Sequence, residues 1–342
     1  MRHRILELEL GYETYVGTRD GVVVAGGGVE HLGLAGQRIS AIHAFRDGTG
    51  DAVVLAGTYG DGLFRSSDRG RSWSPVTGMT APAARTIGPD PLDPAAILCG
   101  TEPARLFRST DGGRTWTELA GIREIPAHVE WYLPYSPRAG ALRNVYAPPG
   151  SRGTMLAAVE VGGLLRSTDG GSTWSIDPIG PNDDIHQVTG DPGDPDLLWS
   201  ALGLAALRSR QRGGGAPKLG GVARSRDGGG TWDVLHTDYT RSVIVPAARP
   251  EQVLAGPALE VGGRGRIEVS SDGGESWEPA AGGVVVPMPD MVELFVPAPD
   301  GTVHAVCSGG RLLRSAPDAW EWRSALPSGQ PDDSVSVCFL ET

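Results

Sequence analysis

The sequence contains little cysteine: its 342 residues include three, Cys99, Cys307 and Cys338. Each of them falls within an apolar stretch of the kind that forms a strand, so we expect three buried thiols. A chain with so few cysteines does not belong to the small secreted domains that are held together by disulfides. Its stability has to come from a hydrophobic core.

Charge and long hydrophobic runs are also scarce. Charged residues make up 21% of the chain, and acidic residues outnumber basic ones by 41 to 30, which gives a net charge of −11. A negative net charge argues against general nucleic-acid binding. No segment is long and apolar enough to span a membrane, and residues 1–10 lack the uninterrupted apolar segment and the cleavage site of a signal peptide. We therefore expect a cytoplasmic protein with no nucleic-acid or membrane partner.

Glycine and proline, in contrast, are abundant, with 51 and 27 residues. This usage favours many short strands joined by turns over long helices. An eight-residue phrase, Ser-x-Asp-x-Gly-x-x-Trp, occurs five times, and a degenerate sixth copy ends at Trp322. The five copies begin at Ser66, Ser109, Ser167, Ser225 and Ser270. Repeats of about 45 residues are typical of four-stranded propeller blades, and the two longer spacings indicate insertions.

The phrase is suited to a hairpin between the third and fourth strands of a blade. Two apolar, strand-like segments precede it, such as residues 54–57 and 62–65 before the first copy. Its glycine fits a turn position with positive φ, its aspartate can accept hydrogen bonds from N–H groups of the turn, and its tryptophan can pack between blades. We therefore expect the five aspartates to be structural, and not calcium ligands or catalytic groups. They are Asp68, Asp111, Asp169, Asp227 and Asp272.

The count of repeat units predicts seven blades. Residues 14–25 match the frame of a unit without its phrase, and the copy near Ser315 completes the set. The last segment, residues 333–340, is a strand with no phrase after it. We predict that it is the innermost strand of the blade whose outer strands come from residues 12–30, which closes the ring and removes the free sheet edges. The predicted fold is all-β: one domain over residues 1–342, a seven-bladed β-propeller of four-stranded antiparallel blades.

With these repeats the sequence resembles the Asp-box (BNR repeat) β-propellers over roughly residues 12–340. That family includes sialidases, other glycosidases, sortilin-type receptors and photosystem assembly factors. The resemblance implies a fold element and leaves several functions open.

The register of the repeats locates the start of each innermost strand, at the mouth of the central channel where ligands of such folds bind. The predicted ring consists of Ser40, Arg85, Arg143, His186, Arg241, Glu293 and Ser336. Three arginines and one carboxylate give it a local charge of about +2, and guanidinium groups match a carboxylate or phosphate at two points. We expect an arginine-lined pocket for an anionic small molecule or glycan. The alternative is a channel neutralised by nearby acids, namely Asp183, Asp184, Asp332, Asp333 and Glu293.

Two insertions account for the longer spacings. Residues 122–141 directly precede an innermost strand and are therefore expected on the mouth face. Their Glu130, Trp131 and Tyr132 are suited to covering a sugar or aromatic ring, and a packed loop is the alternative. Residues 209–221 extend an outer hairpin and are expected to be solvated.

The histidines give no clear metal signature. His43, His128 and His186 belong to different inner segments, and no close histidine pair marks a site. We therefore predict neither a metal nor another cofactor.

The sialidases imply one function for the ring, hydrolysis of an acidic glycoside. By resemblance, the three ring arginines hold the substrate carboxylate. The catalytic set would be Tyr239 with Glu293 as the nucleophilic pair and Asp184, beside His186, as the acid. Sialidases have six blades and an Arg-Ile-Pro motif that this chain lacks, so the resemblance extends to the anion clamp and leaves catalysis open. The photosystem assembly factors imply the alternative, a non-catalytic scaffold that binds a protein partner through its arginine-bearing face.

Overall fold

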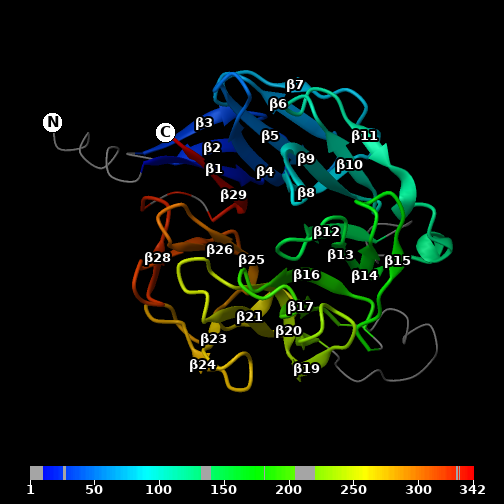
Figure 1. Cartoon of the computed structure of the whole chain (residues 1–342). Helices are drawn as coiled ribbons and strands as arrows, with labels where there is room; N and C mark the ends of the chain where they lie inside the picture. Colours follow the sequence, from blue (N-terminus) through cyan, green and yellow to red (C-terminus); the bar gives the residue numbers. More distant parts are fainter. Residues whose placement is uncertain are drawn as a thin grey trace.

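The protein is described by a computed structural model that covers residues 11–25, 28–131, 140–180, 182–204, 220–328, 330 and 332–342. Its strands form seven antiparallel sheets arranged as blades around a central axis (Figure 1). Six sheets have four strands and the seventh has an additional short strand, which confirms the predicted seven-bladed propeller. No helix in these residues is both long and apolar enough to cross a membrane.

Six blades take their strands from consecutive stretches of the chain. The first three consist of β4 (Ile39–Arg46), β5 (Ala52–Thr58), β6 (Leu63–Ser66) and β7 (Ser74–Pro75); β8 (Ala83–Asp90), β9 (Asp93–Glu102), β10 (Leu106–Ser109) and β11 (Thr117–Leu119); and β12 (Ala141–Tyr146), β13 (Met155–Glu160), β14 (Gly163–Ser167) and β15 (Ser175–Ile176). The next three consist of β16 (Ile185–Gly190), β17 (Leu198–Leu202), β18 (Gly221–Ser225) and β19 (Asp233–His236); β20 (Tyr239–Ile244), β21 (Val253–Glu260), β23 (Glu268–Ser270) and β24 (Glu278–Pro279), with β22 (Gly263–Gly265) paired to β21; and β25 (Val292–Pro297), β26 (Val303–Cys307), β27 (Leu312–Ser315) and β28 (Trp322–Ser324).

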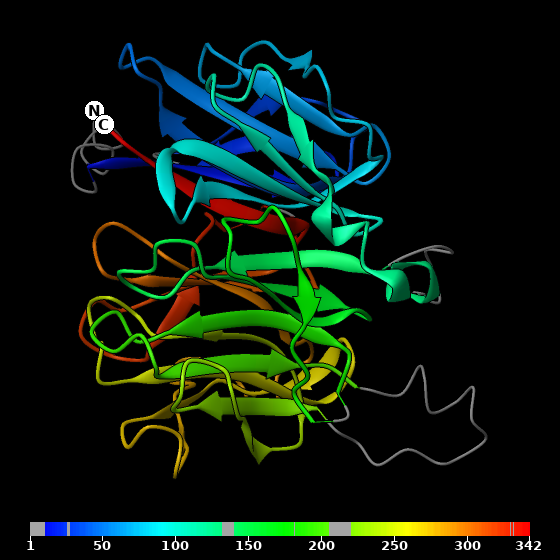
Figure 2. The same ribbon diagram turned by 45° about the vertical axis from the view of Figure 1, so that its right-hand side comes forward.

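The remaining blade joins the two ends of the described chain. It consists of β29 (Ser334–Glu341), β1 (Tyr12–Thr18), β2 (Gly21–Ala25) and β3 (Val29–Gly33), in that order from the axis outward. β29 runs antiparallel to β1, with Tyr15 opposite Cys338 in the register, and the two strands lie side by side in Figures 1 and 2. The predicted closure of the ring by the C-terminal strand is therefore confirmed.

The hydrophobic core lies between neighbouring blades, because each sheet is covered on both faces. β5 is buried along its whole length, as expected for a strand that reads as a continuous apolar run. One of the larger core clusters joins Leu106, Leu142 and Trp174 from two adjacent blades. Cys99, Cys307 and Cys338 are buried free thiols, as the sequence predicted.

The repeated phrase forms the hairpin between the third and fourth strands, and its hydrogen bonds are internal. In the copy that begins at Ser167, the serine Oγ donates to Asp169 Oδ1 at 2.8 Å and accepts from the N–H of Gly171 at 2.9 Å. Thr173 donates to Asp169 through its N–H at 2.9 Å and through Oγ1 at 2.6 Å. Gly171 has φ of +86°, which favours glycine. The aspartate therefore stabilises its own turn.

The phrases predict a loss of stability in acid. Hydrogen bonds, those from Thr173 foremost, lower the pKa of Asp169 from 3.8 to about 2, and the pKa values of Asp68, Asp227 and Asp272 fall to about 2 in the same way. The pKa of Asp111 also falls to about 2, although partial burial opposes the shift. A carboxyl with a lowered pKa in the folded state stabilises the fold above its unfolded pKa and loses that contribution as the pH falls through its folded pKa.

We therefore expect the free energy of unfolding, measured by urea titration, to fall between about pH 4 and about pH 2. Asp169→Asn, which cannot titrate, should be less stable at neutral pH and show a shallower fall over this range. An unchanged slope in that variant would contradict the assignment.

Candidate functional site

A β-bulge interrupts the innermost strand of every blade at the same level. In six blades the register shifts around the residue predicted for the ring, as between Ala84 and Thr86 on β8 and between Leu142 and Asn144 on β12. In the blade that closes the ring, the irregularity lies on β29 between Ser334 and Ser336. Bulges of this kind redirect a side chain out of the ladder.

The redirected side chains surround one central cavity of about 440 Å³. All seven predicted ring residues line it: Ser40, Arg85, Arg143, His186, Arg241, Glu293 and Ser336. Two further arginines, Arg19 and Arg38, also line the cavity and were not predicted. The register of the repeats therefore correctly located the residues that meet at the cavity.

Each ring arginine has a carboxylate partner. Arg85 Nη1 lies 3.2 Å from Glu102 Oε2, and Arg143 Nη1 lies 3.4 Å from Glu160 Oε2. Arg241 Nη1 donates to Glu293 Oε2. Three carboxylates therefore balance the three ring guanidinium groups, and the positive charge that remains at the cavity comes from Arg19 and Arg38. Of the acids that the sequence suggested as partners, Glu293 is the one that pairs with a ring arginine.

Glu102 and Glu160 are the functional neighbours that sequence reasoning missed. Both are buried at the inner end of a second strand, β9 and β13, and neither is among the residues that line the cavity. The signal that could have found them is a shared spacing, since each follows the small residue of its strand, Gly100 or Ala158, by two positions.

Burial and neighbouring charges both shift the pKa values of the paired arginines and glutamates. Burial lowers the pKa of Arg85, and the positive charge of Arg143 adds to that effect. Burial alone would raise the pKa of Glu160, but the surrounding positive groups, Arg143 foremost, hold it well below its ordinary value. Both partners of the Arg143–Glu160 pair are therefore charged at neutral pH, inside the protein.

Tyr59 forms part of the cavity wall between two arginines. The Cζ of Arg38 lies 4.4 Å from the centre of its ring, and the Cζ of Arg85 lies 4.7 Å away. Both distances fit cation–π contacts. Arg38 is exposed, whereas the Arg85 side chain is 6% exposed, so the two present guanidinium groups at different depths of the same wall.

The predicted nucleophilic pair of Tyr239 and Glu293 is not formed. Arg241 lies between them: its Nε donates to the Tyr239 hydroxyl at 2.7 Å, and its Nη1 donates to Glu293. The hydroxyl also lies 3.3 Å from His186 Nε2. Burial, first of all, raises the pKa of Tyr239 above its ordinary value, and the residue is not part of the cavity lining. The prediction failed because Tyr239 begins its strand and points into the blade interface.

The predicted acid lies below the cavity surface. Asp184 precedes β16 and is buried, with Oδ1 3.3 Å from His186 Nε2. His186 lines the cavity, whereas Asp184 does not. Glu293 is consequently the one carboxylic acid among the described residues that line the cavity.

The insertion at residues 122–141 does not place its aromatic residue over the cavity. It begins with two short 3₁₀ helices, η1 (Ala120–Ile122) and η2 (Pro126–Glu130), and Trp131 follows them in the core with 1% exposure. Glu130 is exposed but lies outside the cavity lining. The expected ligand contact is wrong for Trp131, because the indole fills the space between two blades. Tyr132 and most of residues 209–221 lie outside the described residues.

Comparison with known proteins supports the repeat and the fold. Residues 107–118 match the family model of the BNR/Asp-box repeat. No curated protein matches the chain. Among solved structures, it is similar to a GH74 xyloglucanase from Xanthomonas campestris, with a TM-score of 0.65 and 18% identity over 98% of this chain and 53% of the enzyme. The chain therefore spans about half the length of that enzyme.

Structures of YCF48 are similar along most of both chains. YCF48 from Cyanidioschyzon merolae gives a TM-score of 0.61 at 16% identity and covers 90% of this chain and 92% of its own. YCF48 bound to D1 peptide gives 0.55 at 19% identity and 89% of each chain. Identities this low establish the shared architecture alone. The repeat, its internal hydrogen bonds and the closed ring together identify the chain as a seven-bladed β-propeller of the BNR/Asp-box type.

Proposed function

We propose that the central cavity binds a small molecule that carries a carboxylate or a similar anionic group. The observation that carries the proposal is the convergence of Arg85 and Arg143, from equivalent positions of adjacent blades, on one cavity whose paired carboxylates do not line it. The volume of about 440 Å³ suits a sugar acid or another small molecule. Ser40, Asn144 and Ser336 add neutral polar groups to the lining.

The three ring arginines differ in how much of the guanidinium group remains for a ligand. Arg241 uses Nε for Tyr239 and Nη1 for Glu293, so most of its fork is occupied. Arg85 and Arg143 each contact their carboxylate through Nη1 at more than 3 Å, which is longer than a strong charge-assisted hydrogen bond. Arg85 and Arg143 therefore form the clamp, and Glu102 and Glu160 orient it from behind.

Catalytic hydrolysis is not part of the proposal. Glycoside hydrolysis normally uses two carboxyl groups that face the substrate. Glu293 is the only acid that lines the cavity in the described part of the chain, and it is already bound by Arg241. The residues that face the cavity are suited to binding.

The clamp is tested by calorimetry and thermal shift with a panel of sugar acids and small dicarboxylates. Lysine keeps the charge of arginine but loses its two-point fork. We expect Arg85→Lys and Arg143→Lys to weaken binding of the best ligand at least tenfold. At 100 times its dissociation constant, that ligand should stabilise the wild-type protein by about 2.7 kcal/mol.

Arg249→Lys is the matched control, because Arg249 also lies over an aromatic ring, 4.1 Å from Trp320, but outside the cavity lining. This variant should bind the ligand normally. Equal affinities in the wild type, Arg85→Lys and Arg143→Lys would overturn the clamp.

A protein partner is the second candidate function, and a set of exposed apolar side chains favours it. Val261 and Val285 are 57% and 79% exposed, and Leu259 and Val286 are also exposed. The loop of Val261 is joined to the cavity rim, since Ser308, which lines the cavity, donates to the Gly262 carbonyl at 2.9 Å. For a protein partner, Val261→Asp with Val285→Asp should abolish binding in a two-hybrid or interaction assay, and the lysine variants should not. The reverse result favours the small molecule.

A further inference from the structure

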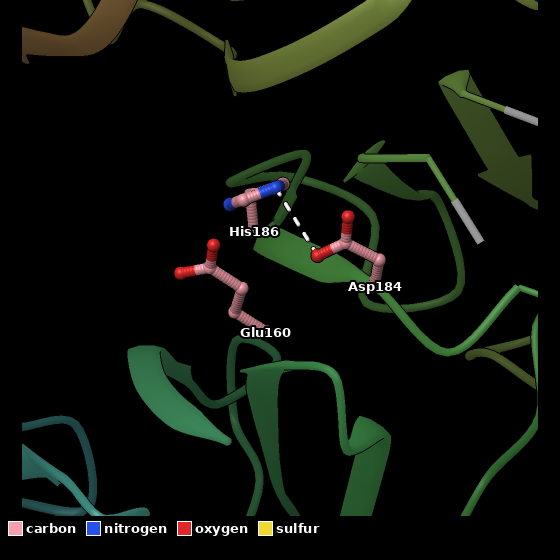
Figure 3. Close-up of side chains that lie close together, drawn as sticks. All are labelled: Glu160, Asp184 and His186. Carbon is pink, nitrogen blue, oxygen red and sulfur yellow. Dashed lines mark ion pairs between the residues drawn. The ribbon is translucent and has the colours of Figure 1, made fainter. Parts of the chain in front are cut away.

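Three potential metal ligands meet behind the cavity wall. Glu160 ends β13, Asp184 precedes β16, and His186 lies on β16. One ligand atom from each residue can be chosen so that all three lie within 4.8 Å of one another, and all three residues are buried. Figure 3 shows the three side chains converging as the corners of a triangle, with the imidazole ring above the carboxylates of Glu160, on the left, and Asp184, on the right.

His186 holds an unsatisfied polar atom in this cluster. Its side chain is 1% exposed, and its Nε2 lies 3.3 Å from Asp184 Oδ1 and 3.3 Å from the Tyr239 hydroxyl. Its Nδ1 is buried and has no hydrogen-bond partner among the described residues. Asp184 Oδ1, 3.3 Å from Nε2, is likewise buried without a hydrogen-bond partner among the described residues. A cation held between Nε2 and this oxygen would satisfy the carboxylate and leave the imidazole proton on Nδ1.

The spacing and chemistry of the cluster suit a divalent ion. Two ligands of a tetrahedral zinc ion, at bond lengths of 2.0–2.2 Å, are separated by about 3.4 Å. The distance of 3.3 Å between His186 Nε2 and Asp184 Oδ1 is near this value and longer than a strong charge-assisted hydrogen bond. The widest separation, up to 4.8 Å, requires a carboxylate to move by about 1.4 Å, which side-chain rotation can supply.

Arg143, which lies beside the cluster, has two opposing effects on metal binding. The charge of Arg143 repels a cation and lowers its affinity. The same guanidinium, 3.4 Å from Glu160 Oε2, also holds that carboxylate in place through an ion pair, as the outer partners of metal ligands usually do. The two carboxylates match the charge of a divalent ion, and the guanidinium of Arg143 then leaves the occupied cluster with one positive charge.

We propose that Glu160, Asp184 and His186 bind one divalent transition-metal ion, with zinc as the best match to a ligand set of one imidazole and two carboxylates. Because His186 lines the cavity, the proposed metal site lies next to it, and a catalytic type of zinc site keeps a fourth position for a further ligand. An anionic ligand in the cavity can occupy that position. The metal site itself does not depend on the anion clamp, since it rests on different side chains.

The experiment measures metal binding directly and without any anionic ligand. Protein freed of metal with a chelator is titrated with Zn²⁺ by calorimetry and with Co²⁺ by visible absorption, in a buffer without carboxylates. We expect one equivalent of metal per chain, and a cobalt spectrum typical of four-coordinate sites. Asp184→Asn and His186→Gln should each weaken binding at least tenfold. His43→Gln is the control, because His43 lines the same cavity but does not belong to the cluster, and it should bind like the wild type.

An X-ray absorption spectrum of the zinc-loaded wild type keeps the test independent of how the variants fold. One imidazole and otherwise oxygen neighbours are expected. The proposal is wrong if the wild type takes up no metal, if Asp184→Asn and His186→Gln bind with wild-type affinity, or if the spectrum shows two imidazoles or sulfur. Metal binding in the Arg85→Lys variant separates the two proposals, since the clamp can fail while this site is retained.

Discussion

Arg143→Ala is expected to lower the free energy of unfolding by about 3–5 kcal/mol, because it leaves Glu160 charged and buried without its guanidinium partner. The Glu160 side chain is 6% exposed, and the Arg143 side chain is 17% exposed. Breaking a buried pair from one side costs far more than the pair contributes as a whole, since the remaining charge keeps its desolvation penalty. Urea unfolding in the presence of a chelator measures the loss without interference from bound metal.

Two variants separate this effect from a general sensitivity to arginine loss. Arg264→Ala breaks an exposed pair with Glu260, 3.3 Å apart, and should cost less than about 1 kcal/mol. Arg143→Ala combined with Glu160→Gln should recover part of the loss, because the uncompensated charge is removed as well. If Arg143→Ala costs no more than Arg264→Ala, the pair is solvated and our account of its energetics is wrong.

Trp131→Ala is expected to cost about 3–5 kcal/mol of stability and to leave ligand affinity unchanged. The indole is among the largest fully buried side chains and packs with Leu106, Leu142 and Trp174. Its Nε1 has no hydrogen-bond partner in the described residues, so Trp131→Phe should be much milder. Thermal unfolding, with binding measured on the folded protein, gives both quantities.

The neighbouring Val129→Ala serves as the control, because Val129 is 83% exposed and its replacement should change stability by less than about 0.5 kcal/mol. If the Trp131→Ala protein has normal stability but binds the ligand more weakly, Trp131 is a ligand contact and this prediction is wrong.

The sequence predicts the fold and the ring because both depend on the repeat period. Once the phrases set the register of the blades, the start of each innermost strand follows by counting, and Arg85, Arg143 and Arg241 are found together with their neighbours. Counting does not show which group lies opposite another across a strand pair. For that reason Glu102 and Glu160 were missed, although they hold two of the three arginines.

The repeat period does not predict the direction of a side chain or the conformation of a loop that lies outside the repeat. The position of Tyr239, two residues before Arg241, predicts a nucleophile beside Glu293, but Arg241 lies between the two groups and donates to both. Trp131 was assigned to the mouth because its insertion precedes an innermost strand, but a loop without a repeat can fold inward and bury its largest side chain. The cytoplasmic compartment stays a prediction.

The pairing of β29 with β1 has a consequence for how the protein is made. β1 is translated at the start of the described chain and β29 at its end, so the innermost position of that blade stays empty until β29 has left the ribosome. Until then β1 presents an unpaired edge, and the contact that completes the ring is one of the most distant in sequence that the chain can form. Nascent chains that stall before β29 should therefore be the species that chaperones bind and proteases remove.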